Sequence, residues 1–145
     1  MSTEAYAKAA LNVVAEPGLR LPDAREVLGV SADSYCRAGQ IPETGGRPWL
    51  RDAWYLTEQI AVPKGSEFSV AAEKCLSNLL DRLSALRAAE KLHASGLARN
   101  SSISLYGFCR NLRDANISYQ PAILSILANL GLPLDEDFYQ LPDEE

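Results

Sequence analysis

Few residues in this chain have the type and spacing that catalysis requires. His93 is its one histidine, and no serine or cysteine motif around it would supply a nucleophile with a base. His93 falls late in an amphipathic segment, where an imidazole can face the carbonyl end of a helix, so a solvent-edged or capping role is favoured over catalysis. The three cysteines (Cys36, Cys75 and Cys109) form no C-x-x-C pair and have no histidine at ligand spacing. We predict that they are small buried hydrophobic residues.

Carboxylates are concentrated at the end of the chain. Asp135, Glu136 and Asp137 are followed by Asp143, Glu144 and Glu145, all within the last eleven residues. A hydrolase needs two carboxylates that converge from separate elements, and the spacing of a calcium loop is absent. Two interpretations remain: a solvated tail, or an acidic surface that attracts a cationic protein. No metal or cofactor is predicted.

The segment from Gly45 to Trp54 contains both tryptophans. Its two glycines precede a proline instead of a helix start, so no row of free backbone amides is available for a phosphate. Trp54 is predicted to lie in the core, because strand aromatics usually serve packing. Trp49 lies between Arg47 and Arg51, and tryptophan and arginine supply most of the binding energy at protein interfaces. We therefore predict that Arg47, Trp49 and Arg51 contact a partner.

The length of 145 residues, with 47% hydrophobic and 23% charged residues, fits a single globular domain spanning residues 1–145. The formal net charge of −5 disfavours nucleic acids and anionic membranes, which need a positive field. No leader peptide or apolar run of transmembrane length is evident, so the cytoplasm is the expected compartment. A homo-oligomer stays possible.

The elements that must position these residues follow from hydrophobic periodicity. Strands are predicted at 5–14, 31–40, 51–60, 102–110 and 132–141. A short helix should end at Gly29, a helix of roughly six turns should run from Val70 to about His93, and another should lie between Pro121 and Gly131. This order predicts an α+β fold: a ferredoxin-like β-α-β-β-α-β antiparallel sheet with helices on one face, plus a C-terminal helix-strand extension.

The sequence resembles a bacterial family known as domain of unknown function 4279. The resemblance is carried by "LPDAREVLGV", "SYCRAGQ", "AWYLTEQ", the long leucine-rich helix and "ILSILANLGLPLDEDFY", and it covers about residues 6–139. The chain departs from the family at Tyr35, where tryptophan is more typical. The family carries no assigned reaction, so the resemblance implies a fold and no activity.

These patterns predict a non-enzymatic protein-binding module. The favoured hypothesis is an immunity protein that neutralises a cognate bacterial toxin, because a small acidic protein can block a basic active site through complementary charge. The partner surface would comprise Arg47, Trp49 and Arg51 together with Asp135, Glu136 and Asp137. The alternative is a regulatory or sensor domain that binds a small molecule on the sheet face or at a dimer seam.

Overall fold

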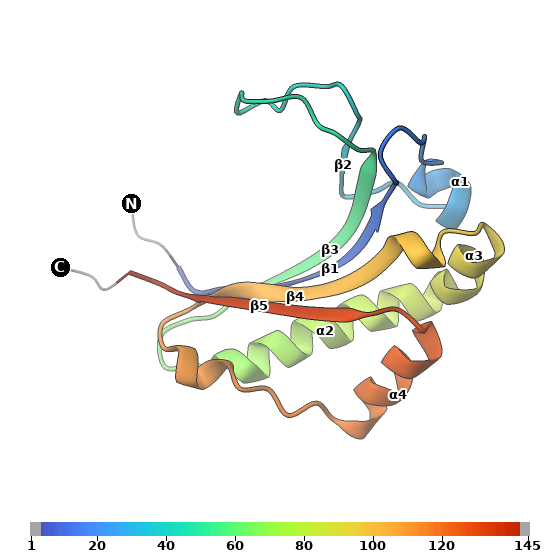
Figure 1. The fold of residues 1–145 in the computed structure, drawn as a ribbon. Helices are drawn as coiled ribbons and strands as arrows, with labels where there is room; N and C mark the ends of the chain where they lie inside the picture. Colours follow the sequence, from blue (N-terminus) through green and yellow to red (C-terminus); the bar gives the residue numbers. More distant parts are fainter. Residues whose placement is uncertain (1–3, 143–145) are drawn as a thin grey trace.

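The computed structural model describes residues 4–142 and contains one five-stranded sheet with the strand order β2-β3-β1-β4-β5 (Figure 1). The strands are β1 (Tyr6–Val14), β2 (Ser34–Cys36), β3 (Ala53–Ala61), β4 (Ser101–Cys109) and β5 (Leu134–Gln140). β1 lies between β3 and β4 and is antiparallel to both, and β2 is antiparallel to β3. β5 pairs with β4 in parallel.

The expected strand periodicity is confirmed in the central strands. Along β1, the side chains of Ala7, Ala9, Leu11 and Val13 are fully buried, while those of the intervening Lys8 and Asn12 are partly exposed. Along β4, every second residue from Ser101 to Cys109 is buried. A strand with one buried face has this pattern because successive side chains point to opposite sides of the sheet.

Within residues 4–142, four α-helices accompany the sheet: α1 (Ala24–Leu28), α2 (Phe68–Ala85), α3 (Ala88–Ala94) and α4 (Pro121–Leu130). Figure 1 shows α2 lying along one face of the sheet, with α4 beneath it and α3 beside α1, while no helix of the described residues lies on the opposite face. The leucine stripe of α2, which includes Leu76, Leu79 and Leu83, is completely buried. This burial removes the apolar stripe from water, as its period of three and four predicts.

Small residues allow α2 to approach the sheet. Ala7 and Ala9 on β1 and Ala72 on α2 are all buried, and the Sγ atom of Cys75 lies 3.1 Å from the carbonyl oxygen of Glu58 on β3. Burial raises the pKa of the Cys75 thiol to about 11. All three cysteines are buried and unpaired, which confirms the predicted packing role.

Two expectations are corrected. The predicted six-turn helix from Val70 to His93 is two helices, because Arg87 adopts a left-handed conformation with φ of 54°. The leucine pattern continues across this break, so periodicity does not reveal it. The sheet is mixed instead of wholly antiparallel, because the chain after α4 enters β5 in the same direction as β4.

Candidate functional site

The segment joining β2 to β3, residues 37–52, projects from the body of the protein and is called the arm (Figure 1, top). Its two branches are joined by backbone hydrogen bonds. Gly39 N donates to the carbonyl oxygen of Trp49, and Trp49 N donates to that of Gln40, each over 2.9 Å. These bonds fix the two branches of the arm beside each other.

Large apolar side chains of the arm are exposed. The exposed fraction is 66% for Ile41, 42% for Trp49 and 84% for Leu50. Arg47 and Arg51 are also exposed, and neither forms an ion pair with any residue in 4–142. Within the described residues, the arm therefore exposes apolar side chains together with two arginines that form no ion pair.

Asp52 anchors the root of the arm. The residue is 5% exposed, and its carboxylate accepts hydrogen bonds from the backbone N–H of Ala38 at 2.9 Å and of Leu21 at 3.1 Å. Arg37 Nη1 lies 3.3 Å from the same carboxylate. The N–H of Ala38, then that of Leu21, and the Arg37 guanidinium hold the pKa of Asp52 below its ordinary value. A buried carboxylate satisfied in this way fixes the two ends of the arm relative to the chain before α1.

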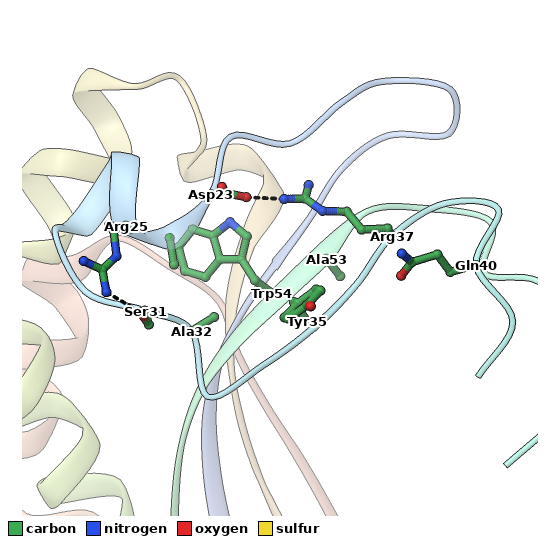
Figure 2. A pocket seen from close by; sticks show the side chains of 10 residues that line it. Asp23, Arg25, Ser31, Ala32, Tyr35, Arg37, Gln40, Ala53 and Trp54 are labelled. Carbon is green, nitrogen blue, oxygen red and sulfur yellow. Dashed lines mark hydrogen bonds and ion pairs between the residues drawn. The ribbon is translucent and has the colours of Figure 1, made fainter. Parts of the chain in front are cut away.

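A groove of about 460 Å³ lies beside the root of the arm, between α1 and β2. Figure 2 shows the indole of Trp54 between Arg25 on the α1 side and Tyr35 on the β2 side. Trp54 is 3% exposed, and its Nε1–H donates to the carbonyl oxygen of Pro22 at 2.9 Å. Its predicted structural role is thereby confirmed. Gln40 lines the groove and belongs to the arm, so the two features adjoin.

The structure places the predicted contact residues in two separate groups. Arg47, Trp49 and Arg51 lie together on the arm, which extends from the β2 side of the sheet. The acidic residues lie on β5 at the other edge, where Asp135, Glu136 and Asp137 are all exposed. Asp143, Glu144 and Glu145 fall outside the described residues.

The side chains of β5 alternate between the two faces of the sheet. Glu136 accepts a hydrogen bond from the Tyr119 hydroxyl, in the segment before α4. Asp137 accepts one from the Tyr139 hydroxyl at 2.5 Å. Asp135 and Asp137 therefore share the face of the sheet that carries no helix, as the period of two predicts.

The groove was not foreseen from the sequence. Its lining comes from α1, β2, the first residues of β3 and the start of the arm. Arg25, Tyr35, Trp54 and Arg37 are the respective examples. Tyr35 lies in a strand and is 69% exposed, but this exposure is seen only in the structure and gave no signal in the sequence. The apposition of α1 and β2 depends on the crossover between β1 and β2, which no short motif encodes.

The residue types that bind metal ions do not cluster in the described part of the chain. Among residues 4–142 no set of three histidine, cysteine or acidic residues could hold a metal ion. His93 lies exposed in the last turn of α3, in agreement with a solvent-edged position. Within the same residues, no helix has the length and apolar character needed to cross a membrane.

Comparisons with models of protein families, with curated proteins and with solved structures gave no match. The function must therefore be inferred from the arm, the groove and the charge of β5.

Proposed function

We propose that this protein is a non-enzymatic binding module whose arm contacts a protein partner. The observation that carries this proposal is that one projecting segment exposes Ile41, Trp49 and Leu50 together with Arg47 and Arg51, two arginines that form no ion pair with any residue in 4–142. These apolar side chains come from the two hydrogen-bonded branches of the arm, and exposed apolar side chains that gather into a patch mark interaction surfaces. Tryptophan and arginine are the residue types enriched among the residues that dominate binding energy.

The more specific form of the proposal is an immunity protein that binds and neutralises a basic bacterial toxin. The formal net charge of −5 and the acidic residues of β5 support it, because complementary charge accelerates association. The arm would then make the contacts that determine affinity, and the acidic residues of β5 would raise the association rate by attracting the basic partner. We also propose that β1 to β4 form a ferredoxin-like core with β5 added beside β4, and that the family resemblance reflects this core.

A second candidate function is a regulatory domain that binds a small molecule, and the groove beside Trp54 is the observation that favours it. Its volume of about 460 Å³ lies within the usual range for ligand pockets. A metabolite that raises the melting temperature without any protein partner would support this alternative. The exposed apolar arm, however, has no role in such a function.

The proposal is tested by co-purifying the partner from the native host and measuring its affinity for arm variants. Trp49→Ala and Leu50→Ala are each expected to weaken binding, with Trp49→Ala costing more than about 1 kcal/mol. Leu112→Ala is a matched control for Leu50→Ala, since Leu112 is also an exposed leucine, with an exposed fraction of 46%, and lies outside the arm. A partner that binds both arm variants as tightly as the wild type would disprove the role of the arm.

A further inference from the structure

The groove has one wall made by a helix and another made by an edge strand. β2 is the outermost strand beside β3, so its far side pairs with no strand among the described residues. α1 forms the facing wall, with Trp54 between the two in Figure 2. An edge strand beside a groove is a recurrent binding site for extended peptides, because the peptide can bond to the strand while its side chains enter the groove.

The two arginines of the groove differ in their partners. Arg37 is held by ion pairs with Asp23 and Asp52. Arg25 Nη2 donates to the Ser31 hydroxyl at 2.8 Å, and Arg25 forms no ion pair with any residue in 4–142. Among the described residues, the guanidinium of Arg25 therefore has no carboxylate partner at its side of the groove. A carboxylate is the ligand group that complements a guanidinium best, since it can accept two parallel hydrogen bonds.

Apolar surface adjoins this charge. Ala32, Trp54 and the exposed ring of Tyr35 line the groove, and Gln40 connects it to the arm, where Ile41 and Trp49 are exposed. A ligand that follows this surface needs an acidic side chain next to apolar ones. A polypeptide satisfies both requirements and is long enough to reach from the groove to the arm.

We infer that the groove binds an acidic side chain, carried by an extended segment of the partner protein, with the carboxylate on Arg25 and a neighbouring apolar side chain against Tyr35. This inference rests on the proposed protein-binding function, and it specifies that the part of the partner that enters the groove carries an acidic side chain. It differs from the steering role of β5, which concerns basic residues of the partner at the other edge of the sheet.

The test is a nuclear magnetic resonance titration with two blocked tripeptides, N-acetyl-Leu-Glu-Leu-amide and its counterpart with glutamine. The Nε1–H of Trp54 and the Nε–H of Arg25 report on the groove. The glutamate peptide is expected to shift both signals saturably with a dissociation constant of roughly 1 mM, and the glutamine peptide to bind about tenfold more weakly.

Two variants assign the effect to Arg25. Arg25→Gln should remove the preference for glutamate, while Arg99→Gln, at an exposed arginine outside the groove, should retain it. Unchanged signals from the rest of the protein show that each variant is folded. The inference is overturned if the glutamate peptide causes no saturable shift, if both peptides bind equally, if Arg25→Gln retains the preference, or if acetate alone saturates the same signals as tightly.

The peptide titration is independent of the partner assay. If the glutamate peptide does not bind while Trp49→Ala weakens partner binding, the role of the arm is supported and the groove is excluded as a binding site for an acidic side chain. If the peptides bind as expected while the arm variants leave partner affinity unchanged, binding of an acidic side chain in the groove is supported and the proposed role of the arm in partner binding is disproved.

Discussion

At the scale of single residues, the two tryptophans show how position decides role. Trp54 lies in β3 and donates its indole N–H to Pro22, so its ring is almost completely buried. Trp49 lies five residues earlier, on the arm, and remains 42% exposed. The sequence distinguishes them because Trp54 belongs to an apolar strand, whereas Trp49 follows a proline and lies between two arginines. Residue context was sufficient for this prediction.

Asp52 carries the first prediction at this scale. Replacing Asp52 with asparagine is expected to lower the free energy of unfolding at neutral pH by about 2–5 kcal/mol, because a buried charge pair and a hydrogen bond to backbone N–H are lost. Chemical denaturation of the wild type and of Asp52→Asn measures the difference.

The effect should depend on pH with a defined sign. The pKa of Asp52 is lowered from 3.8 by folding, so the ionised carboxylate stabilises the protein above pH 3.8 and this contribution is lost as the pH falls through the folded-state pKa. The difference in the free energy of unfolding between wild type and Asp52→Asn should therefore shrink as the pH falls from 3.8 through the folded-state pKa of Asp52. Asp33, whose pKa is also lowered, is present in both proteins and cancels. A difference that stays constant down to acid unfolding would contradict this account.

At the scale of elements, the sequence predicted four of the five strands and the stops of α1 and α4 well, but it predicted β2 too long, at 31–40 instead of Ser34–Cys36, and missed the break between α2 and α3. Gly29 and Gly131 end α1 and α4 in left-handed conformations, as their positions predict. Gly107 on β4 is required by packing, since a Cβ there would collide with the carbonyl oxygen of Tyr6. At the break the left-handed residue is Arg87, which gives no such signal.

Arg87→Gly is expected to raise the free energy of unfolding by up to about 1 kcal/mol. Glycine adopts φ of 54° without the steric cost that arginine carries, although it adds entropy to the unfolded chain. The ion pair lost with Glu90 is exposed on both sides and contributes little. Lys74→Gly, which also replaces an exposed cation but lies in the interior of α2, is the control and should lower stability by about 0.5–1 kcal/mol. If thermal unfolding shows Arg87→Gly to be destabilised like the control, the left-handed conformation is not strained.

At the scale of the whole molecule, the α+β class and most element positions were predictable, but the assembly of the site was not. The alternation of β1 and the leucine stripe of α2 are local patterns, and both appear in the structure as expected. The groove requires α1 to pack beside β2, and the separation of the arm from β5 requires these elements to occupy opposite edges of the sheet. Both properties depend on strand order, which arises from contacts between residues far apart in the chain.

The separation of charge across the sheet predicts a kinetic role for β5. If Asp135 and Asp137 steer a basic partner, Asp135→Asn combined with Asp137→Asn should slow association several-fold at low salt and leave dissociation nearly unchanged, because exposed charges act mainly on the encounter rate. Glu16→Gln combined with Asp81→Asn changes the net charge equally at exposed positions away from β5 and is the matched control. Surface plasmon resonance with the co-purified partner, at low and high salt, measures both rates. Equal association rates for the two double variants would show that β5 does not steer the partner and that its carboxylates only add to the overall charge.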